Sequence, residues 1–214
     1  MKDVQIKSRE NIRERGEVFT AEREVKAMCD LIGRDIADIE KRVLEPAAGN
    51  GNFLVEILQR RIAYVTERYI KNDQWFCFLV ALSNIYAIEL CEENVVEAKR
   101  RLKDLMLKAV TNPAYSYITA IDVILDTNII HGNFFTEKKN AILIYEYVPN
   151  YENWTFDITL HTLYEVKQMA KRYTANVAPC AIGGLVTWLN ILKSQTRHKS
   201  LVQLSLFPDI TSCI

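Results

Sequence analysis

The residues best suited to chemistry stand in one short run, VLEPAAGNGNF at residues 43–53. The pattern predicts an apolar strand, a tight loop of small residues and then the start of a helix. Gly49 and Gly51 let the backbone turn sharply and approach a ligand closely, and a helix start presents unpaired N–H groups. Glu45 adds a carboxylate at the end of the strand. The run therefore predicts a ligand-binding loop.

The same loop lacks the patterns that bind phosphate. The dinucleotide pattern would need a third glycine where Leu54 stands, and no Gly-Lys-Ser/Thr sequence follows Gly51. The remaining possibility is a ligand without phosphate, held by the loop backbone and one acidic residue. S-adenosylmethionine is such a ligand, with its charged methionine end near Glu45. The structural alternative is an ordinary strand-to-helix turn, which the length of the whole run disfavours.

The elements around the loop alternate between strands and helices, which predicts an α/β fold with a doubly wound, mostly parallel sheet. Ligands of such sheets bind beyond the carboxyl ends of the strands. A first helix is expected from its N-cap Thr20 to Ile32, with Val25, Met28 and Leu31 also on its apolar face. Strands are expected at 42–45, 85–89, 128–131 and 141–147, and further helices at 53–69, 75–82, 91–110 and 118–125.

The run LEPAAGNGNFL at residues 44–54 resembles the cofactor loop of adenine-N6 DNA methyltransferases, the S-adenosylmethionine-dependent enzymes of bacterial restriction–modification systems. Residues 16–20, GEVFT, resemble the segment of that family that packs over the methionine part of the cofactor. Ala21 stands where proline is usual there, a mild departure because proline only presets φ. The resemblance implies a Rossmann-like methyltransferase domain that binds S-adenosylmethionine.

Two later strand ends also resemble the family. At residues 85–90, IYAIEL, the resemblance implies that Glu89 accepts hydrogen bonds from the ribose hydroxyls. At residues 129–135, IIHGNFF, Asn133 stands for the aspartate that accepts from the adenine amino group, and Phe134 would flank the ring. Alone, these two residues fit a turn and a core aromatic, but their order in the chain favours the site. The implied cofactor residues are Thr20, Glu45, Ala47, Gly49, Gly51, Phe53, Glu89, Asn133 and Phe134.

The family's catalytic tetrapeptide, an amide or acid followed by two prolines and an aromatic ring, does not follow the third strand. Asn112-Pro113-Ala114-Tyr115 has similar letters but lies before that strand, where a helix-ending turn is expected. The segment 156–160 resembles the approach to the motif, after which Tyr164 could stack on a base. A helix over residues 160–173, burying Leu163, Val166 and Met169 or Ala170, is favoured there. The catalytic residues stay unassigned, with Asn112, Tyr115 and Tyr164 as the candidates.

The last fourteen residues, 201–214, are interpreted as a tail behind a domain of residues 1–200. In the tail, QLSLF at 203–207 resembles the peptide by which bacterial replication and repair proteins bind the β sliding clamp. Leu206 and Phe207 would fill an apolar pocket and Gln203 would bind its polar rim, with Leu204 between them. The alternative is a final strand or a tail folded onto the core. The basic run at 193–199 is interpreted as a solvated connector.

Composition limits the classes of function. Lys plus Arg and Asp plus Glu number 27 each, so no global positive field indicates nucleic acid, and DNA contact needs a local patch or a partner. Five cysteines without a CxxC pair, and three histidines without ligand spacing, predict neither disulfides nor a metal site. A reducing, cytoplasmic compartment fits, because the first residues are polar and the longest apolar stretch, 75–82, is too short for a membrane.

The function expected from the sequence is an adenine-N6 DNA methyltransferase, or a subunit or remnant of one, with DNA and a specificity subunit as partners. A non-catalytic module that keeps the cofactor fold and acts through DNA or the sliding clamp is the alternative. A methyltransferase acting on RNA or protein is a third hypothesis.

Overall fold

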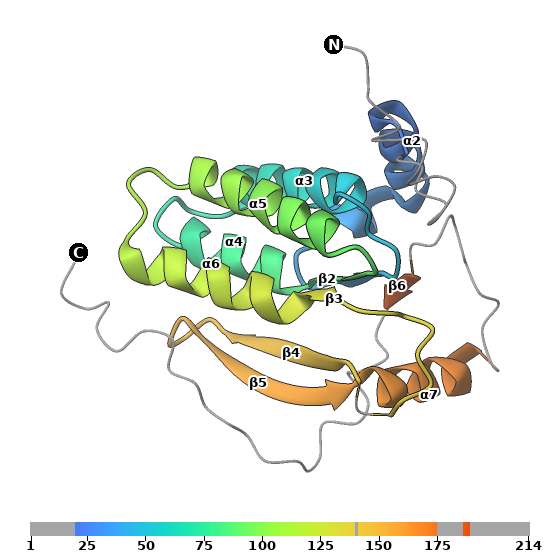
Figure 1. Ribbon diagram of the computed structural model, residues 1–214. Coiled ribbons are helices and arrows are strands. Elements are labelled where there is room, and N and C mark those ends of the chain that lie inside the picture. The colour runs from blue at the N-terminus through green and yellow to red at the C-terminus, as the bar shows by residue number, and fades with distance from the viewer. Residues whose placement is uncertain (1–19, 140, 175–185, 189–214) are drawn as a thin grey trace.

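Three parallel strands form the centre of the fold (Figure 1). The computed structural model describes residues 20–139, 141–174 and 186–188. Strand β1 (Arg42–Glu45) pairs in parallel with β2 (Ile85–Glu89), and β2 pairs in parallel with β3 (Ile129–His131). A short strand, β6 (Val186–Trp188), lies antiparallel to β1 and gives the order β3-β2-β1-β6. The predicted α/β class is confirmed.

The expected elements up to residue 131 are all present, with their ends displaced by at most three residues. The helices are α2 (Glu22–Ile32), the 3-10 helix η1 (Gly33–Ala37), α3 (Asn52–Arg68), α4 (Gln74–Ser83), α5 (Glu92–Ala109), α6 (Tyr115–Asn128) and α7 (Leu163–Thr174). Two further strands, β4 (Leu143–Asn150) and β5 (Thr155–Thr162), precede α7.

The two faces of the sheet are covered differently. Val43 and Ile85 point into the main core, which also holds the apolar faces of α3, α4, α5 and α6. Their neighbours Leu44 and Tyr86 point the other way, into a smaller cluster with residues of β4 and α7. Because side chains alternate along a strand, the face that carries Val43 packs against the helices, and the opposite face packs against residues of β4 and α7. In Figure 1, α3 and α5 form the layer above α4 and α6, and the β4–β5 hairpin lies below α4 and α6, where its Tyr147, Phe156 and Ile158 join the main core.

The expectation that residues 141–147 add a fourth parallel strand is wrong. Strand β4 pairs antiparallel with β5 in a separate two-stranded sheet. The chain reverses at residues 151–154, where the Asn150 side-chain oxygen accepts hydrogen bonds from the N–H groups of Glu152 and Asn153. The second half of a doubly wound sheet is therefore not found among the residues described.

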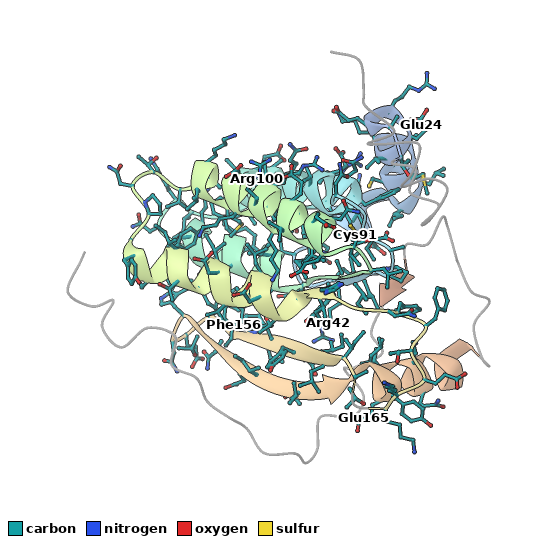
Figure 2. The ribbon with its side chains drawn as sticks, viewed as in Figure 1. Glu24, Arg42, Cys91, Arg100, Phe156 and Glu165 are labelled. Carbon is teal, nitrogen blue, oxygen red and sulfur yellow. The ribbon has the colours of Figure 1, made fainter. Side chains whose placement is uncertain are left out.

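A buried ion cluster joins the hairpin to the sheet. The carboxylate of Glu146 on β4 is 3% exposed and accepts from the Arg42 guanidinium of β1 and from His161 Nε2 of β5, the latter at 3.0 Å. Arg42 lies between the parallel sheet and the hairpin (Figure 2). The Tyr86 hydroxyl donates to the Tyr145 carbonyl at 2.9 Å. These bonds explain why an apolar run that could extend the sheet lies across its face instead.

Two details of the first helix differ from expectation. Thr20 does not cap α2, because Ala21 precedes the helix and no side-chain capping bond forms. Leu31 is 71% exposed, whereas Val25 and Cys29 are buried and Ile32 packs against the core. The helix begins at Glu22, one residue later than expected, and its buried stripe follows the i, i+4, i+7 spacing from Val25.

Helix α7 begins at Leu163, three residues later than expected, because residues 160–162 belong to β5. Its start is fixed by a reciprocal cap: Glu165 N–H donates to the Thr162 hydroxyl, and the Glu165 carboxylate accepts from the Thr162 N–H. Leu163 and Val166 are buried, as predicted.

One arginine is fully buried in the main core. The Arg61 side chain on α3 donates to the carbonyls of Ile36, Lys41 and Ala81, which belong to η1, the approach to β1 and α4. Burial lowers its pKa to about 9, so the guanidinium stays charged at neutral pH. Arg61 thereby ties three separate segments to α3.

Two buried cysteines make no disulfide within the described residues. Cys29 and Cys77 are buried and free, and burial raises the pKa of each thiol to about 11. No helix in the described part is long and apolar enough to cross a membrane. Residues 16–19, the basic run 193–199 and the whole tail 201–214 lie outside the described residues.

Candidate functional site

The loop between β1 and α3 turns through two glycines in the left-handed region. The φ angles are +53° at Gly49 and +85° at Gly51. The loop is held to β2 because the Ala48 N–H donates to the Ile88 carbonyl at 3.3 Å. The predicted sharp turn at the carboxyl ends of β1 and β2 is therefore confirmed.

Gly51 is also required for packing. A Cβ atom built at this position would lie 2.9 Å from the Ala98 Cβ, where α3 passes α5. The close approach at Gly51 is thus to another helix of the protein, which the sequence did not indicate.

Glu45 is the residue of the loop with the most perturbed chemistry. It is 4% exposed; its Oε1 accepts from the Ala47 N–H at 3.2 Å, and its Oε2 has no hydrogen-bond partner among the described residues. Burial raises its pKa to about 7, and the nearby charge of Glu89 adds to this. A buried carboxyl with a free oxygen is poised to accept from a positively charged ligand group.

Glu89, at the end of β2, bridges two loops. Its Oε2 accepts from the Gly49 N–H at 2.7 Å, and its Oε1 accepts from the Cys91 N–H at 2.9 Å. Cys91 marks this edge of the sheet in Figure 2. A carboxylate has about four lone-pair sites. Both oxygens of Glu89 can therefore accept a further bond from a ligand hydroxyl.

A network that the sequence did not single out fixes the far side of the loop. Arg101 on α5 donates to the Asn50 carbonyl and to the Asn52 side-chain oxygen, both at 2.8 Å. The Asn52 side-chain N–H donates in turn to the Thr20 carbonyl at 2.9 Å. Asn50 Oδ1 is buried and has no hydrogen-bond partner within residues 20–139, 141–174 and 186–188. Thr20 thus lies at the loop, although Thr20 and Asn52 are 32 positions apart in the sequence.

The third strand brings Asn133 and Phe134 to the same edge. The Gly132 N–H donates to the Glu89 carbonyl at 2.9 Å. Asn133 is exposed and its side-chain oxygen accepts from the Phe135 N–H at 2.9 Å, as in an ordinary turn. Phe134 packs partly against the smaller core cluster. Their predicted contacts with adenine remain predictions.

The remaining predicted cofactor residues lie in the first loop. Ala47 is exposed and offers its N–H to Glu45, and Phe53 lies in the first turn of α3 against the main core. Phe53 therefore anchors the end of the loop to the main core.

Two of the three catalytic candidates share one turn, and the third lies elsewhere in the fold. Asn112 lies in the turn after α5, with φ of +49°, and Tyr115 is 85% exposed at the start of α6. Since α5 has 18 residues, or roughly 27 Å of helix, this turn lies at the opposite end of α5 from the cofactor loop. Tyr164, in the first turn of α7, lies instead beside the loop that follows β3, with Lys139 5.3 Å from its ring centroid.

No protein-family model, curated protein or solved structure matches this chain.

Proposed function

We propose that the chain binds S-adenosylmethionine at the carboxyl ends of β1, β2 and β3 and acts as an adenine-N6 DNA methyltransferase, or as a subunit or remnant of one. The observation that carries the proposal is Glu45, a buried carboxyl beside the glycine loop, one oxygen of which has no partner in the part of the chain that the structure describes. The methionine end of the cofactor carries positive charge at its amine and sulfonium groups. It would therefore give the Glu45 carboxylate a positively charged partner.

The other residues of the edge suit the remaining parts of the cofactor. Glu89 has acceptor sites for ribose hydroxyls beside its bonds to Gly49 and Cys91. Asn133 and Phe134, in the loop bound to Glu89 through Gly132, are proposed to hold the adenine. When bound, the cofactor supplies a methyl group on a sulfonium; the chain's own residues bind and orient it.

The order of the parallel strands also favours this proposal. Strands β1, β2 and β3 alternate with helices and lie side by side in the order β3-β2-β1. This order is typical of one half of a Rossmann-like sheet, and such sheets bind their ligands beyond the strands' carboxyl ends.

A second candidate is a cofactor-binding module that transfers no methyl group. The hairpin position of β4 favours it, since the family's catalytic tetrapeptide follows a fourth strand of the main sheet. Such a module would reach DNA directly or through the β sliding clamp, by means of Gln203, Leu204, Leu206 and Phe207. Both candidates require the cofactor to bind.

A radiolabelled methyl-transfer assay separates the two candidates. The methyltransferase predicts incorporation into unmethylated mixed-sequence DNA, reduced at least 10-fold in Glu89→Ala at limiting cofactor, because a charge-assisted bond is lost. Glu152→Ala, an exposed acid at the hairpin turn, is the matched control and should retain the activity. A Gly51 substitution is unsuitable because it would disturb the contact with Ala98.

Absence of incorporation into DNA by folded wild-type protein that binds the cofactor would favour the non-catalytic module. The same assay with RNA and with protein substrates tests the third hypothesis, and incorporation there alone would exclude DNA as the acceptor.

A further inference from the structure

Three aromatic side chains belong to two neighbouring segments beside the edge that holds the candidate cofactor site. Phe134 and Phe135 belong to the loop after β3, and their ring centroids are 5.6 Å apart in an edge-to-face contact. Tyr164 belongs to the first turn of α7, which this loop runs beside (Figure 1). Phe135 is 82% exposed and Tyr164 is 37% exposed. Large aromatic side chains left exposed on neighbouring segments are candidates for contact with a partner.

Two lysines lie over these rings and connect the loop with α7. Lys167 Nζ of α7 lies 4.4 Å from the Phe134 ring centroid and donates to the Phe134 carbonyl. Lys139 Nζ of the loop lies 5.3 Å from the Tyr164 ring centroid. Lys138 is exposed in the same loop. Two ring–ammonium contacts, one at Phe134 and one at Tyr164, therefore join the loop to α7.

Two acids belong to the same segments. Glu137 is exposed in the loop. The Glu165 carboxylate accepts from the Thr162 N–H and hydroxyl and is thus turned toward the start of α7. The three lysines consequently outnumber the acids where the rings are exposed.

We infer that this aromatic–lysine surface, formed by the exposed rings of Phe135 and Tyr164 with Lys138, Lys139 and Lys167, binds single-stranded DNA. Exposed rings provide stacking platforms for bases, and lysines between them pair with the phosphates that link those bases. In a duplex the base faces are covered by neighbouring bases, so the rings favour an unpaired strand. The inference rests on the proposed function, which gives the bound strand its role: a strand held here lies beside the edge of the sheet assigned to the cofactor.

Fluorescence anisotropy with a labelled single-stranded, mixed-sequence DNA oligonucleotide tests the surface, using the full chain without cofactor. Phe135→Ala and Tyr164→Ala should each weaken binding about 5- to 150-fold, because each removes a stacking platform. Phe135→Trp keeps a ring and should retain binding. Tyr115→Ala, which removes an 85% exposed ring at the opposite end of α5, is the matched control and should bind like the wild type.

The salt dependence gives a second readout. Replacing both Lys138 and Lys139 with glutamine should reduce the slope of log K against log salt by about 1.4, since each lost phosphate contact removes about 0.7. The double variant Lys71→Gln, Lys108→Gln removes two exposed lysines elsewhere and should leave the slope unchanged.

Several results would overturn the inference: no binding by the wild type at low salt, equal losses in the Tyr115 control, or tighter binding to duplex DNA, to single-stranded RNA or to anionic lipid vesicles. The cofactor is absent from this titration, so its outcome is separate from that of the proposed function. If the protein binds the single strand through these residues but does not bind S-adenosylmethionine, the inference about this surface stands and the proposed function is contradicted.

Discussion

Replacing Arg61 with methionine is expected to lower the free energy of unfolding by about 3–5 kcal/mol. Methionine fills much of the same volume, so the loss comes mainly from three carbonyls, of Ile36, Lys41 and Ala81, that no longer receive a bond. Each buried acceptor left without a donor costs about 1–3 kcal/mol. Removing a buried charge recovers part of this, but the carbonyls belong to three segments that cannot all move to new donors.

Urea denaturation followed by circular dichroism measures the effect. Arg100→Met is the matched control, because Arg100 is exposed on α5 and pairs with Glu97 and Asp104 there. Its loss should be far smaller, since exposed ion pairs contribute little. Equal midpoints for the two variants would contradict the role assigned to Arg61.

Replacing Glu45 with glutamine is expected to stabilise the ligand-free protein above neutral pH, by up to about 3 kcal/mol. Burial raises the pKa of Glu45 from 4.5 to about 7 in the folded state. The folded protein therefore binds the proton more tightly than the unfolded chain does. The contribution of Glu45 to the free energy of unfolding is fully present below pH 4.5 and is lost as the pH rises to about 7. Glutamine does not titrate and escapes this loss.

The measurement is the free energy of unfolding of the wild type and of Glu45→Gln across that pH range. The difference between them should be smallest near pH 4.5, grow up to about pH 7 and stay constant above it. Glu152→Gln, at an exposed position, should follow the wild-type curve. Parallel curves for the wild type and Glu45→Gln would show that the carboxyl is not held out of water.

The strands and helices before residue 131 could be predicted from the sequence because their signals are local. The run at 43–53 combines an apolar strand, small loop residues and a helix start, and the structure follows it closely. Gly49 and Gly51 adopt positive φ, as the turn requires. Glu45 and Glu89, both singled out as strand-end acids, lie at one edge because parallel strands end on the same side.

The position of β4 could not be predicted because it depends on distant partners. The apolar run 141–147 fits a parallel strand as well as a hairpin strand. The choice is made by contacts such as Arg42 with Glu146, which are 104 residues apart. Arg61 was missed for the same reason, since nothing in its local sequence marks an arginine that binds three distant carbonyls.

The most direct test of the cofactor site is a calorimetric titration of the purified protein with S-adenosylmethionine, alongside Glu89→Ala and Glu152→Ala. We predict one site in the wild type, the same affinity in Glu152→Ala, and an affinity about 10- to 150-fold weaker in Glu89→Ala, because a charge-assisted bond worth about 1.5–3 kcal/mol is lost. Thermal unfolding would first establish that the variants fold. A wild type that releases no heat of binding, or a Glu89→Ala variant that binds as tightly as the wild type, would contradict the assignment of this edge to the cofactor.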